Sequence, residues 1–471
     1  LITITGLFGS SIFNQAASVD RPNIVVILTD DQGYADISFN PDHPDEVSTP
    51  HMDRLANEGV FFTQAYTSGV VCSPTRAGMM LGRYQQRVGV YTAGEGGNGF
   101  DPKLPIFPSF LPDEYTSMAI GKWHLGLDED YPELKWHAMS RGFDEAYKFM
   151  GRGAHDYFDL KGIKGDYSAI YRNKRRLEED EYEGYLTTRL SEEAVAFIDR
   201  QKDNPFFLYL AYNAVHTPAQ APQKDIDFYK NKFPHLSDTR ATLMAMLYHL
   251  DEGVGSVVKK LKDENLWENT LLFFLTDNGG SGAMEANNGI LRGFKQMVYE
   301  GGIRTPWVVS WPAKFKGGRT IDTPVISFDI LPTVMDALNL KAPKKNPFDG
   351  KSILPLISDE STDHHSELYW DIGAPKHTWG VRQGNWKAWG QKDVVELYNL
   401  AEDPSESKDL ASEYPAKAKE LTQLHAAWKK EMVASANGGQ ATGNSPETES
   451  DKPKLSKAER AQRKAERAKK Q

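Results

Sequence analysis

Residues 23–31 read NIVVILTDD, and this stretch decides the fold. The apolar side chains follow one another without the alternation of a strand that has one face in water. A short β-branched run of this kind predicts a strand buried on both faces, as in a parallel sheet covered by helices. Similar apolar runs recur further along the chain, at 117–121, 206–212, 271–276 and 307–311.

Helical patterns lie between several of these runs. Thr49 and Pro50 suit the N-cap and the first position of a helix that closes at Gly59. Residues 238–262 place apolar side chains three or four positions apart, which is the spacing of one helix face. Strands that alternate with helices predict an α/β fold with a large, mostly parallel central sheet flanked by helices.

The pattern changes near residue 366. Residues 378–389 alternate around a glycine and predict an antiparallel hairpin, and residues 415–432 predict a helix. We therefore expect a large α/β domain at 20–365. A small C-terminal subdomain, made of an antiparallel sheet and one helix, is expected at 366–433.

The two ends of the chain differ from this body. Residues 1–18 read LITITGLFGSSIFNQAAS, which is uncharged, largely apolar and closed by small residues. They predict part of a signal peptide, and hence export to the periplasm or the extracellular space, rather than a strand or a membrane anchor. Residues 434–471 are poor in apolar side chains, with nine basic and two acidic residues from Lys452 onward. We expect a basic, disordered tail.

Charge and cysteine content narrow the class of protein. The net charge is −10, from 55 basic and 65 acidic residues, which disfavours a nucleic-acid-binding body. No segment beyond the leader is long and apolar enough to predict a transmembrane span. The chain has one cysteine, Cys72. A single thiol in an exported protein is either buried and inert or retained because its chemistry is needed.

Acidic residues follow two of the predicted strands. Asp30 and Asp31 end the first one, and Asp277 and Asn278 end the run at 271–276. Each group also suits a plain turn. Together they offer three carboxylates and an amide oxygen at the carboxyl edge of the sheet, where α/β proteins bind ligands. Such hard oxygen ligands favour Ca²⁺ or Mg²⁺, and no cysteine or histidine cluster has zinc spacing.

Cys72 opens the segment CSPTRAGMMLGR. Ser73 suits a helix N-cap with Pro74 at the first helical position, which would leave Cys72 just outside a helix N-terminus. Backbone N–H groups at such an end favour an anion. Arg76, within one turn of that end, can donate a pair of hydrogen bonds to oxyanion oxygens.

Further cations and histidines follow other strands. Strand alternation in Gly121-Lys122-Trp123-His124 would send Lys122 and His124 to the same side. His216 follows the run at 206–212, and Lys295 lies in a later polar loop. Each residue alone is more often structural or solvated. Their joint pattern, acids for a metal and cations for a tetrahedral anion, indicates a catalytic centre.

These motifs resemble those of the type I sulfatase family, in the alkaline phosphatase superfamily. Cys72-Ser73-Pro74-Thr75-Arg76 is similar to the family's C-x-P-x-R modification motif, and Gly121-Lys122-Trp123-His124 to its second signature. The resemblance extends from Asn23 to about Met432. It implies a sulfuric ester hydrolase of the arylsulfatase type.

The resemblance implies one Ca²⁺ ion, held by Asp30, Asp31, Asp277, Asn278 and the modified Cys72. It implies that a sulfatase-maturing enzyme oxidises Cys72 to formylglycine (3-oxoalanine), whose hydrate is the nucleophile. It assigns sulfate recognition to Arg76, Lys122, His124, His216 and Lys295. Of these, His216 with Lys295 would serve the leaving group, and His124 the hemiacetal hydroxyl.

The substrate expected from the resemblance is a sulfated carbohydrate. Weak candidates for substrate contacts are His155, Asp156, Trp379 and Arg382, each of which is more simply a loop or packing residue. Two alternatives stay open. A phosphoester or phosphonate hydrolase of the same superfamily shares the fold. A non-catalytic glycan-binding protein would result if Cys72 were unmodified.

Overall fold

A computed structural model describes residues 21–126, 134–149, 154–161 and 169–434. The predicted leader at 1–18, and the predicted tail except for residue 434, lie outside these ranges. The described strands are β1 (Asn23–Thr29), β2 (Val60–Phe62), β3 (Ala65–Tyr66), β4 (Thr116–Lys122), β5 (Glu145–Phe149), β6 (Ile170–Arg172), β7 (Arg175–Arg176), β8 (Phe206–Ala211), β9 (Thr270–Thr276), β10 (Trp307–Ser310), β11 (Arg319–Ile321), β12 (Val325–Ile326), β13 (Glu367–Asp371), β14 (Thr378–Gln383), β15 (Trp386–Gln391) and β16 (Val394–Asn399).

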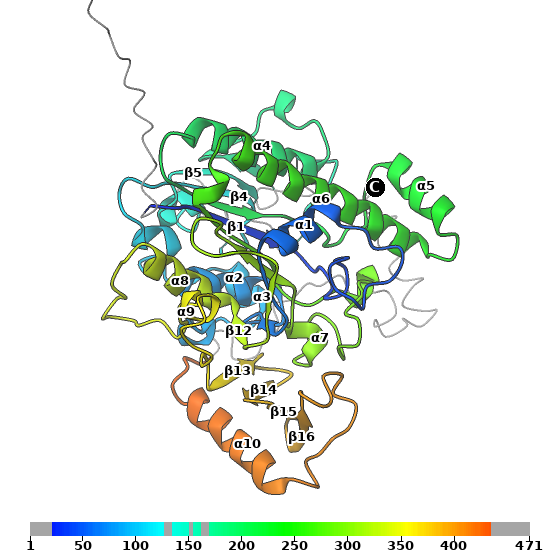
Figure 1. The fold of residues 1–471 in the computed structure, drawn as a ribbon, viewed down its shortest axis with the longest axis vertical. Coiled ribbons are helices and arrows are strands. Elements are labelled where there is room, and N and C mark those ends of the chain that lie inside the picture. Colours follow the sequence, from blue (N-terminus) through cyan, green and yellow to red (C-terminus); the bar gives the residue numbers. More distant parts are fainter. Residues whose placement is uncertain (1–20, 127–133, 150–153, 162–168, 435–471) are drawn as a thin grey trace, which may run out of the picture.

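The helices flank these strands (Figure 1). They are α1 (Pro50–Glu58), α2 (Cys72–Leu81), α3 (Ala93–Gly97), α4 (Leu186–Gln201), α5 (Gln223–Lys232), α6 (Asp238–Asp263), α7 (Glu300–Ile303), α8 (Ile330–Ala337), α9 (Leu354–Ile357) and α10 (Pro415–Lys429). The predicted helices at 50–58 and 238–262 are confirmed as α1 and α6. Thr49 is the N-cap of α1 and Pro50 opens it, as the sequence predicts.

Ten strands form the main sheet, in the order β11-β2-β10-β9-β1-β8-β4-β5-β6-β7. The five central strands, β9, β1, β8, β4 and β5, are parallel to one another. β10 runs antiparallel to both of its neighbours. The α/β fold with a mostly parallel sheet is therefore confirmed, and its parallel part is central.

The register of the central strands decides where their ends lie. Thr29 at the end of β1 pairs with Thr276 at the end of β9, and Leu28 pairs with Ala211 at the end of β8. Gly121 of β4 pairs with the same Ala211. The residues that follow these four strands therefore leave the sheet side by side, along one carboxyl edge.

Both faces of the main sheet are buried under helices, as the first strand predicts. All seven residues of β1 are buried. Val25 and Ile27 pack with buried side chains of α1, α4 and α6, whereas Ile24, Val26 and Leu28 pack with those of α2 and α8. Figure 1 shows these two helical layers on opposite sides of the sheet. Each fully buried aliphatic side chain contributes about 1.5–3 kcal/mol, so this strand anchors the edge that follows it.

The C-terminal unit lies at one end of the molecule (Figure 1). β13, β14, β15 and β16 form an antiparallel sheet in chain order, and α10 packs on it. The predicted hairpin is confirmed: β14 and β15 pair across Gly384, whose φ of 57° favours glycine. The predicted helix begins at Pro415 but ends at Lys429, three residues early.

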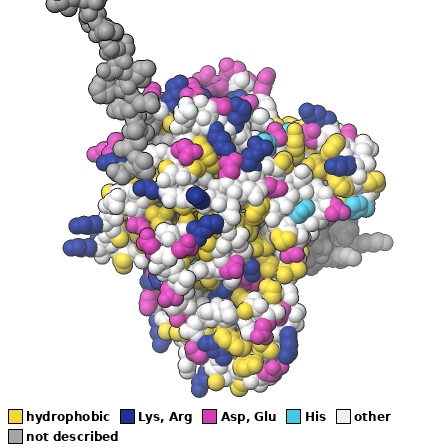
Figure 2. Space-filling view, viewed as in Figure 1, with side chains coloured by type: hydrophobic (Ala, Val, Ile, Leu, Met, Phe, Trp, Pro, Cys, Tyr) yellow, Lys and Arg dark blue, Asp and Glu magenta, His cyan; other side chains and the backbone are white. Residues whose placement is uncertain are grey.

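Acidic and basic side chains are interspersed over the face seen in Figure 2. In the ranges that the structure describes, no helix is both long enough and apolar enough to span a bilayer.

Candidate active site

The carboxyl edge of the main sheet brings residues from four segments to one place. Asp30 and Asp31 follow β1, Asp277 and Asn278 follow β9, and Lys122 is the last residue of β4. The structure sets these residues around Cys72 at the first turn of α2, although they come from segments far apart in sequence.

Cys72 lies within this cluster and is 2% exposed. Its Sγ atom is 3.6 Å from Asp30 Oδ1, 3.3 Å from Lys122 Nζ and 3.4 Å from Lys295 Nζ. Two ammonium groups thus face the side chain at position 72. An anion that forms or binds there is stabilised by fixed positive charges in a site shielded from water.

The helix that carries Cys72 begins two residues earlier than the sequence suggests. Cys72 is the first residue of α2 and Val71 is the N-cap, so the predicted N-cap role of Ser73 is wrong. The Ser73 hydroxyl instead donates a 2.7 Å hydrogen bond to the carbonyl oxygen of His124. Ser73 therefore joins the start of α2 to the segment after β4, a link that local capping rules cannot reveal.

Three carboxylates and three cations neutralise one another around Cys72. Arg76 donates from Nε and Nη2 to Asp277 Oδ2, at 2.9 and 2.7 Å, and from Nη1 to the carbonyl oxygen of Lys122 at 2.6 Å. Lys122 pairs with Asp30, and Lys295 Nζ lies 2.7 Å from Asp31 Oδ1. All of these carboxylates are buried, so pairing is required to offset the loss of hydration.

The surroundings shift the pKa values of the two neighbouring aspartates in opposite directions. Burial, together with the charge of Asp277, raises the pKa of Asp30 well above its ordinary value. Burial also acts to raise the pKa of Asp31, but the nearby Lys295, His216 and Lys122 outweigh it and lower that pKa. Asp30 therefore holds a proton more readily than Asp31.

The acidic groups fit a hard divalent cation. Within the described ranges, the buried Oδ1 of Asn278 has no hydrogen-bond partner, while its Nδ2 donates to Asp31 Oδ1 at 2.8 Å. Asp30, Asp31, Cys72 and His216 also offer ligand atoms within 4.8 Å of one another. An unpartnered amide oxygen beside carboxylates is the donor set that Ca²⁺ prefers. Bound charge would also relieve the repulsion between Asp30 and Asp277.

Two histidines face the same centre. His216, in the segment after β8, has its Nε2 3.7 Å from Asp31 Oδ2. Burial and the charge of Lys295 lower the pKa of His216, and burial with the charge of Lys122 lowers that of His124 much further. Both imidazoles are therefore neutral near pH 7 and able to accept a proton.

His124 reaches the site by another route than strand alternation. β4 ends at Lys122, and His124 has a left-handed φ of 55°. Ser73 fixes its carbonyl oxygen, and within the described part of the chain its buried Nδ1 has no hydrogen-bond partner. The turn of the backbone, rather than a strand repeat, orients this ring.

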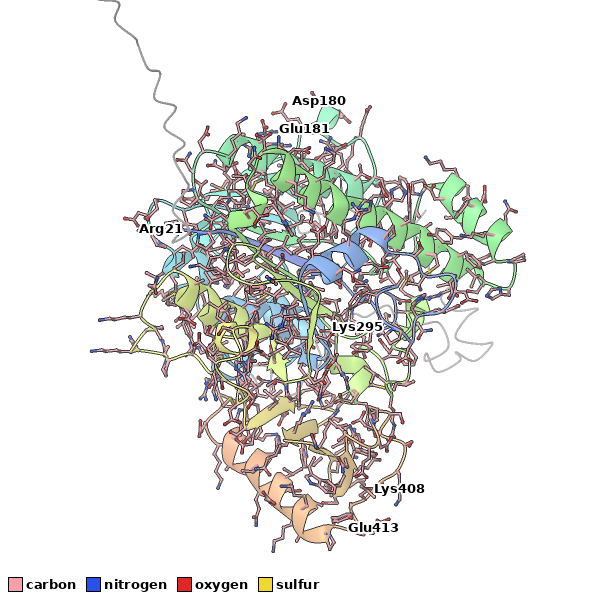
Figure 3. All side chains as sticks on the ribbon, viewed as in Figure 1. Arg21, Asp180, Glu181, Lys295, Lys408 and Glu413 are labelled. Atoms are coloured by element: carbon pink, nitrogen blue, oxygen red, sulfur yellow. The ribbon has the colours of Figure 1, made fainter. Side chains whose placement is uncertain are left out.

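Lys295 lies in a loop that is tied to both sides of the site. Its backbone N–H donates to the carbonyl oxygen of Gly280 at 3.0 Å, and that of Gln296 donates to Val70 at 2.8 Å. Figure 3 shows Lys295 at the level where the main sheet gives way to the C-terminal unit. Burial lowers the pKa of Lys295, but Asp31 and Cys72 outweigh this and raise it, so the ammonium keeps its charge.

A tyrosine that the sequence does not single out positions His216. The hydroxyl of Tyr157 lies 2.8 Å from the carbonyl oxygen of Asn213 and 2.9 Å from that of His216, and so joins both ends of this turn. Tyr157 follows His155 and Asp156, so the polar loop does serve the site. Its contribution comes from a buried aromatic residue instead of the two polar ones.

The four weak substrate candidates are engaged elsewhere. Nδ1 of His155 lies 2.6 Å from the carbonyl oxygen of Asp156, and Asp156 accepts from the backbone of Phe158 and from Gln220. The Trp379 ring stacks on His425 of α10, with centroids 4.4 Å apart. Arg382 donates to Tyr66 and Gln64. None of these contacts involves the residues around Cys72, and a substrate role for the four residues stays a prediction.

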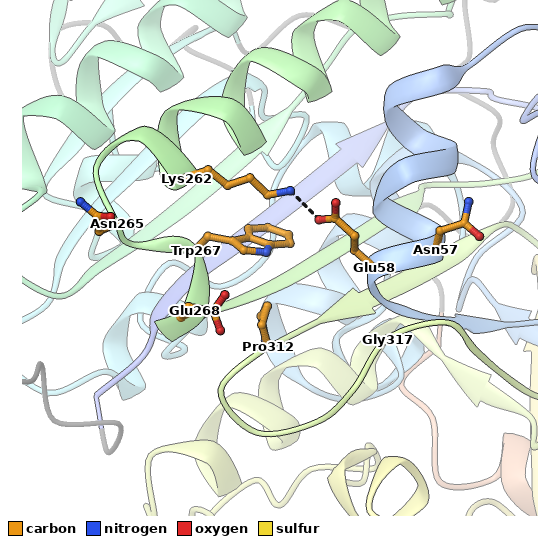
Figure 4. A pocket seen from close by; sticks show the side chains of 8 residues that line it. All are labelled: Asn57, Glu58, Lys262, Asn265, Trp267, Glu268, Pro312 and Gly317. Carbon is orange, nitrogen blue, oxygen red and sulfur yellow. Dashed lines mark hydrogen bonds and ion pairs between the residues drawn. The ribbon is translucent and has the colours of Figure 1, made fainter.

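A surface groove of about 640 Å³ lies at the opposite edge of the sheet (Figure 4). It is lined by the ends of α1 and α6 and by the segment between α6 and β9. Glu58 of α1 and Lys262 of α6 form a 2.6 Å ion pair there. Trp267 also lines it and precedes β9. The groove therefore lies at the amino ends of the parallel strands, away from Cys72.

Comparisons with known proteins point to one family. A family model described as Sulfatase matches residues 22–340, and a second, described as N-sulphoglucosamine sulphohydrolase, C-terminal, matches 293–436. The chain is 31% identical to an uncharacterised sulfatase YdeN of Escherichia coli (strain K12), over 74% of this chain and 68% of that protein. It is 30% identical to N-acetylgalactosamine-6-sulfatase of Canis lupus familiaris, again over 74% and 68%.

Solved structures share the whole fold. The crystal structure of Ps i-CgsB in complex with k-i-k-neocarrahexaose has a TM-score of 0.81 and 32% identity, over 90% of this chain and 96% of that one. A phosphonate monoester hydrolase of Agrobacterium radiobacter has a TM-score of 0.61 at 19% identity, over 88% and 96%, and shares the fold alone.

The fold and the family match define a hydrolase of the alkaline phosphatase superfamily. Within it, the chain belongs to the sulfatase family. It is accordingly a sulfuric ester hydrolase.

Proposed function

We propose that this enzyme hydrolyses sulfate esters of a carbohydrate, with formylglycine at position 72 and one bound Ca²⁺. The observation that carries the proposal is the convergence on Cys72 of two ammonium groups and a buried acidic cluster. The carbohydrate is supported by the relatives: one is an N-acetylgalactosamine-6-sulfatase, and the structure at 32% identity holds a neocarrahexaose.

The nucleophile would come from Cys72 itself. As formylglycine hydrate, position 72 would supply one hydroxyl that attacks sulfur and a second through which the sulfate is later released. Lys122 and Lys295, both within 3.4 Å of Sγ, would stabilise the negative charge on the transferring group. Arg76 acts through Asp277 and the carbonyl oxygen of Lys122, and so fixes the edge on which both residues lie.

The metal ligands would be Asp30, Asp31, Asp277, Asn278 and the modified residue 72. Ca²⁺ would supply Lewis acidity toward a sulfate oxygen and toward the hydroxyl at position 72. The protein's own contribution is to hold the acids in register at the ends of β1 and β9 and to leave the Asn278 amide oxygen without a protein partner in the described ranges.

Two proton transfers remain for the histidines. We assign protonation of the leaving alkoxide to His216, with Lys295 beside it, because both side chains lie within 3.7 Å of the Asp31 carboxylate. We assign deprotonation of the second hydroxyl to His124, which burial keeps neutral.

We further propose that residues 1–18 direct export to the periplasm or the extracellular space, and that a maturing enzyme oxidises Cys72. We divide the body of the chain into a catalytic domain at 20–365 and a C-terminal subdomain at 366–433. The residues proposed for chemistry all precede the second part.

The mass of the Cys72 peptide tests the nucleophile. Conversion of the thiol to the aldehyde lowers the mass by roughly 18 Da, and we expect this in protein from a host with a sulfatase-maturing enzyme. Cys72→Ala should lose sulfate release from a sulfated oligosaccharide while its Tm stays close to that of the wild type. An unmodified thiol in fully active enzyme would rule the nucleophile out.

The same preparation separates the alternatives. A sulfatase should turn over an aryl sulfate faster than the matching aryl phosphate or phosphonate, and the reverse order would favour the phosphonate monoester hydrolase that shares the fold. A protein that binds the sulfated oligosaccharide with retained thiol and no turnover would be a glycan-binding module.

A further inference from the structure

A second cluster of metal-ligating side chains lies apart from Cys72. It consists of Asp329, His364 and His365. Nε2 of His364 is 3.0 Å from Asp329 Oδ2, and Nε2 of His365 is 2.8 and 3.0 Å from the two oxygens of the same carboxylate. Asp329 is fully buried and both imidazole side chains are at most 6% exposed. Three donor atoms thus meet in a space of atomic size.

The two histidines are neighbours in sequence, yet both rings turn to one carboxylate. In an extended chain, consecutive side chains point to opposite sides. Here the chain between α9 and β13 is irregular, and the two rings meet at 74° with centroids 4.4 Å apart. The Lys351 ammonium donates to the carbonyl oxygen of His364 and holds this segment against the catalytic body. The sequence predicts no zinc site because Asp329 lies 35 positions from His364.

The Asp329 carboxylate is held in place from behind. The backbone N–H of Ile326 donates to Oδ2 and that of Lys351 to Oδ1, both at 2.9 Å. A carboxylate has about four lone-pair positions, so two stay directed at the imidazoles. Hydrogen bonds that orient a ligand in this way are the usual outer support of a protein metal site.

The distances fit a small ion with nitrogen ligands. Tetrahedral zinc with bonds of roughly 2.0–2.1 Å sets its ligand atoms roughly 3.3 Å apart. The observed separations of 2.8–3.0 Å need to open by only a few tenths of an ångström. His364 and His365 also line a cavity of about 180 Å³, together with Asp322 and Asp363. A water or a carboxylate from this cavity can complete the coordination.

We propose that Asp329, His364 and His365 bind a zinc ion, with the fourth ligand taken from the cavity. Two imidazoles select zinc over Ca²⁺, which requires more oxygen ligands. Asp329 immediately precedes α8 of the main body, and only Ser366 separates His365 from β13 of the C-terminal sheet. The ion would therefore join the start of α8 to the segment that leads into the C-terminal sheet. This inference does not depend on the proposed function of Cys72.

Zinc titration of the full chain tests the site. The protein is first freed of transition metals, saturated with Ca²⁺ and then titrated with Zn²⁺ against a chromophoric chelator. The wild type should bind one zinc ion more than His365→Gln, which keeps a hydrogen-bond donor toward Asp329 but loses the imidazole. At this site the affinity should fall by more than the roughly 10- to 100-fold that loss of an outer-shell partner costs. Zinc should raise the Tm of the wild type and not that of the variant.

His249→Gln is the matched control. His249 forms a 2.9 Å pair with Asp225, a single imidazole on a single carboxylate, and should bind zinc as the wild type does. Equal zinc stoichiometry and affinity in the wild type and His365→Gln would overturn the proposal. So would a wild type that binds no zinc, and the cluster would then be a set of hydrogen bonds only. Because Ca²⁺ is saturating and both variants keep Cys72, failure here leaves the sulfatase proposal untouched.

Discussion

Two clusters in this molecule are both built from buried carboxylates and cations, yet we propose only one of them as a catalytic site. One surrounds Cys72. The other, here called the junction cluster, consists of Tyr66, Glu300, Arg382, Lys387 and Glu406 and lies between the main body and the C-terminal sheet. Lys387 Nζ is 2.9 Å from Glu300 Oε1 and 2.8 Å from Glu406 Oε1, and Tyr66 donates to Glu300 Oε2 at 2.7 Å.

The difference lies in what completes each cluster. In the junction cluster, burial and the charge of Glu300 raise the pKa of Glu406 to about 7, so this carboxyl group can hold a proton near neutral pH. Around Cys72, three acids meet three cations, and the Asn278 amide oxygen has no partner in the described residues. Buried charge alone therefore does not indicate a site. A buried ligand atom without a hydrogen-bond partner, close to a reactive side chain, does indicate a site.

The largest expected effect is that of calcium removal. Treatment with a Ca²⁺-selective chelator should abolish sulfate release. Without the ion, the site would lose its Lewis acid, and the proposed carboxylate and Asn278 ligands would have no cation between them. Added Ca²⁺ should restore the rate, and Zn²⁺ should not. Full activity after calcium removal, with calcium absent by elemental analysis, would show that the Cys72 cluster functions without a bound ion.

Next in size is the loss of one ammonium from the Cys72 cluster. Lys295→Met should lower kcat/KM by about 10²–10³, which is typical for removal of one electrostatic partner of a transition state. Lys408→Met is the matched control, since Lys408 is exposed on the C-terminal unit and pairs with Glu413 (Figure 3). A Lys295→Met enzyme with the kcat/KM of the control would remove Lys295 from the reaction.

The equivalent change in the junction cluster should affect stability in place of rate. Lys387→Met leaves Glu300 and Glu406 buried without their shared cation, and loss of one partner of a buried pair costs about 3–5 kcal/mol. Urea unfolding measures this free energy. The kcat/KM of the folded variant should stay within a few-fold of the wild type, and a 100-fold loss would show that the two clusters are coupled.

The smallest effect is a pH dependence carried by Glu406. Its pKa is about 7 in the folded protein against an ordinary 4.5, so between these values the folded state holds a proton that the unfolded state releases. The stability that this group contributes is full below about pH 4.5 and is lost as pH rises through 7. The slope is at most about 1.4 kcal/mol per pH unit.

Comparison with Glu406→Gln isolates this contribution. The free energy of unfolding of the wild type, relative to the variant, should fall from pH 5 to pH 8. Parallel curves over that range would show that Glu406 titrates normally.

Much of the fold follows from local patterns. The apolar run at 23–29 and the stripe at 238–262 predict β1 and α6 because burial on two faces, or on one stripe, leaves a direct trace in the sequence. The antiparallel direction of β10 leaves none. A strand pattern is the same in both directions, and the direction of β10 depends on the path of the long loop that carries Lys295.

The candidate site is predictable to a similar depth. Residues directly after parallel strands, such as Asp30 and Asp277, can be placed together from topology alone. Contacts between loops cannot. Ser73 donates a hydrogen bond to the carbonyl oxygen of His124, and Tyr157 donates one to that of His216. Both bonds join segments that come together only in the packed structure. For the same reason, the meeting of Asp329 with two later histidines is invisible before folding.

The pairs that define the Cys72 cluster join residues very distant along the polypeptide. Arg76 and Asp277 are 201 positions apart, and Asp31 and Lys295 are 264 apart. Contacts of such separation carry a large loop-closure entropy and cannot form before both partners have been synthesised. Until the ribosome has synthesised Lys295, the pocket around Cys72 cannot be complete, and the maturing enzyme that we propose would find the thiol accessible during that interval. Turnover in this protein would therefore report that the chain from β1 to Lys295 has assembled.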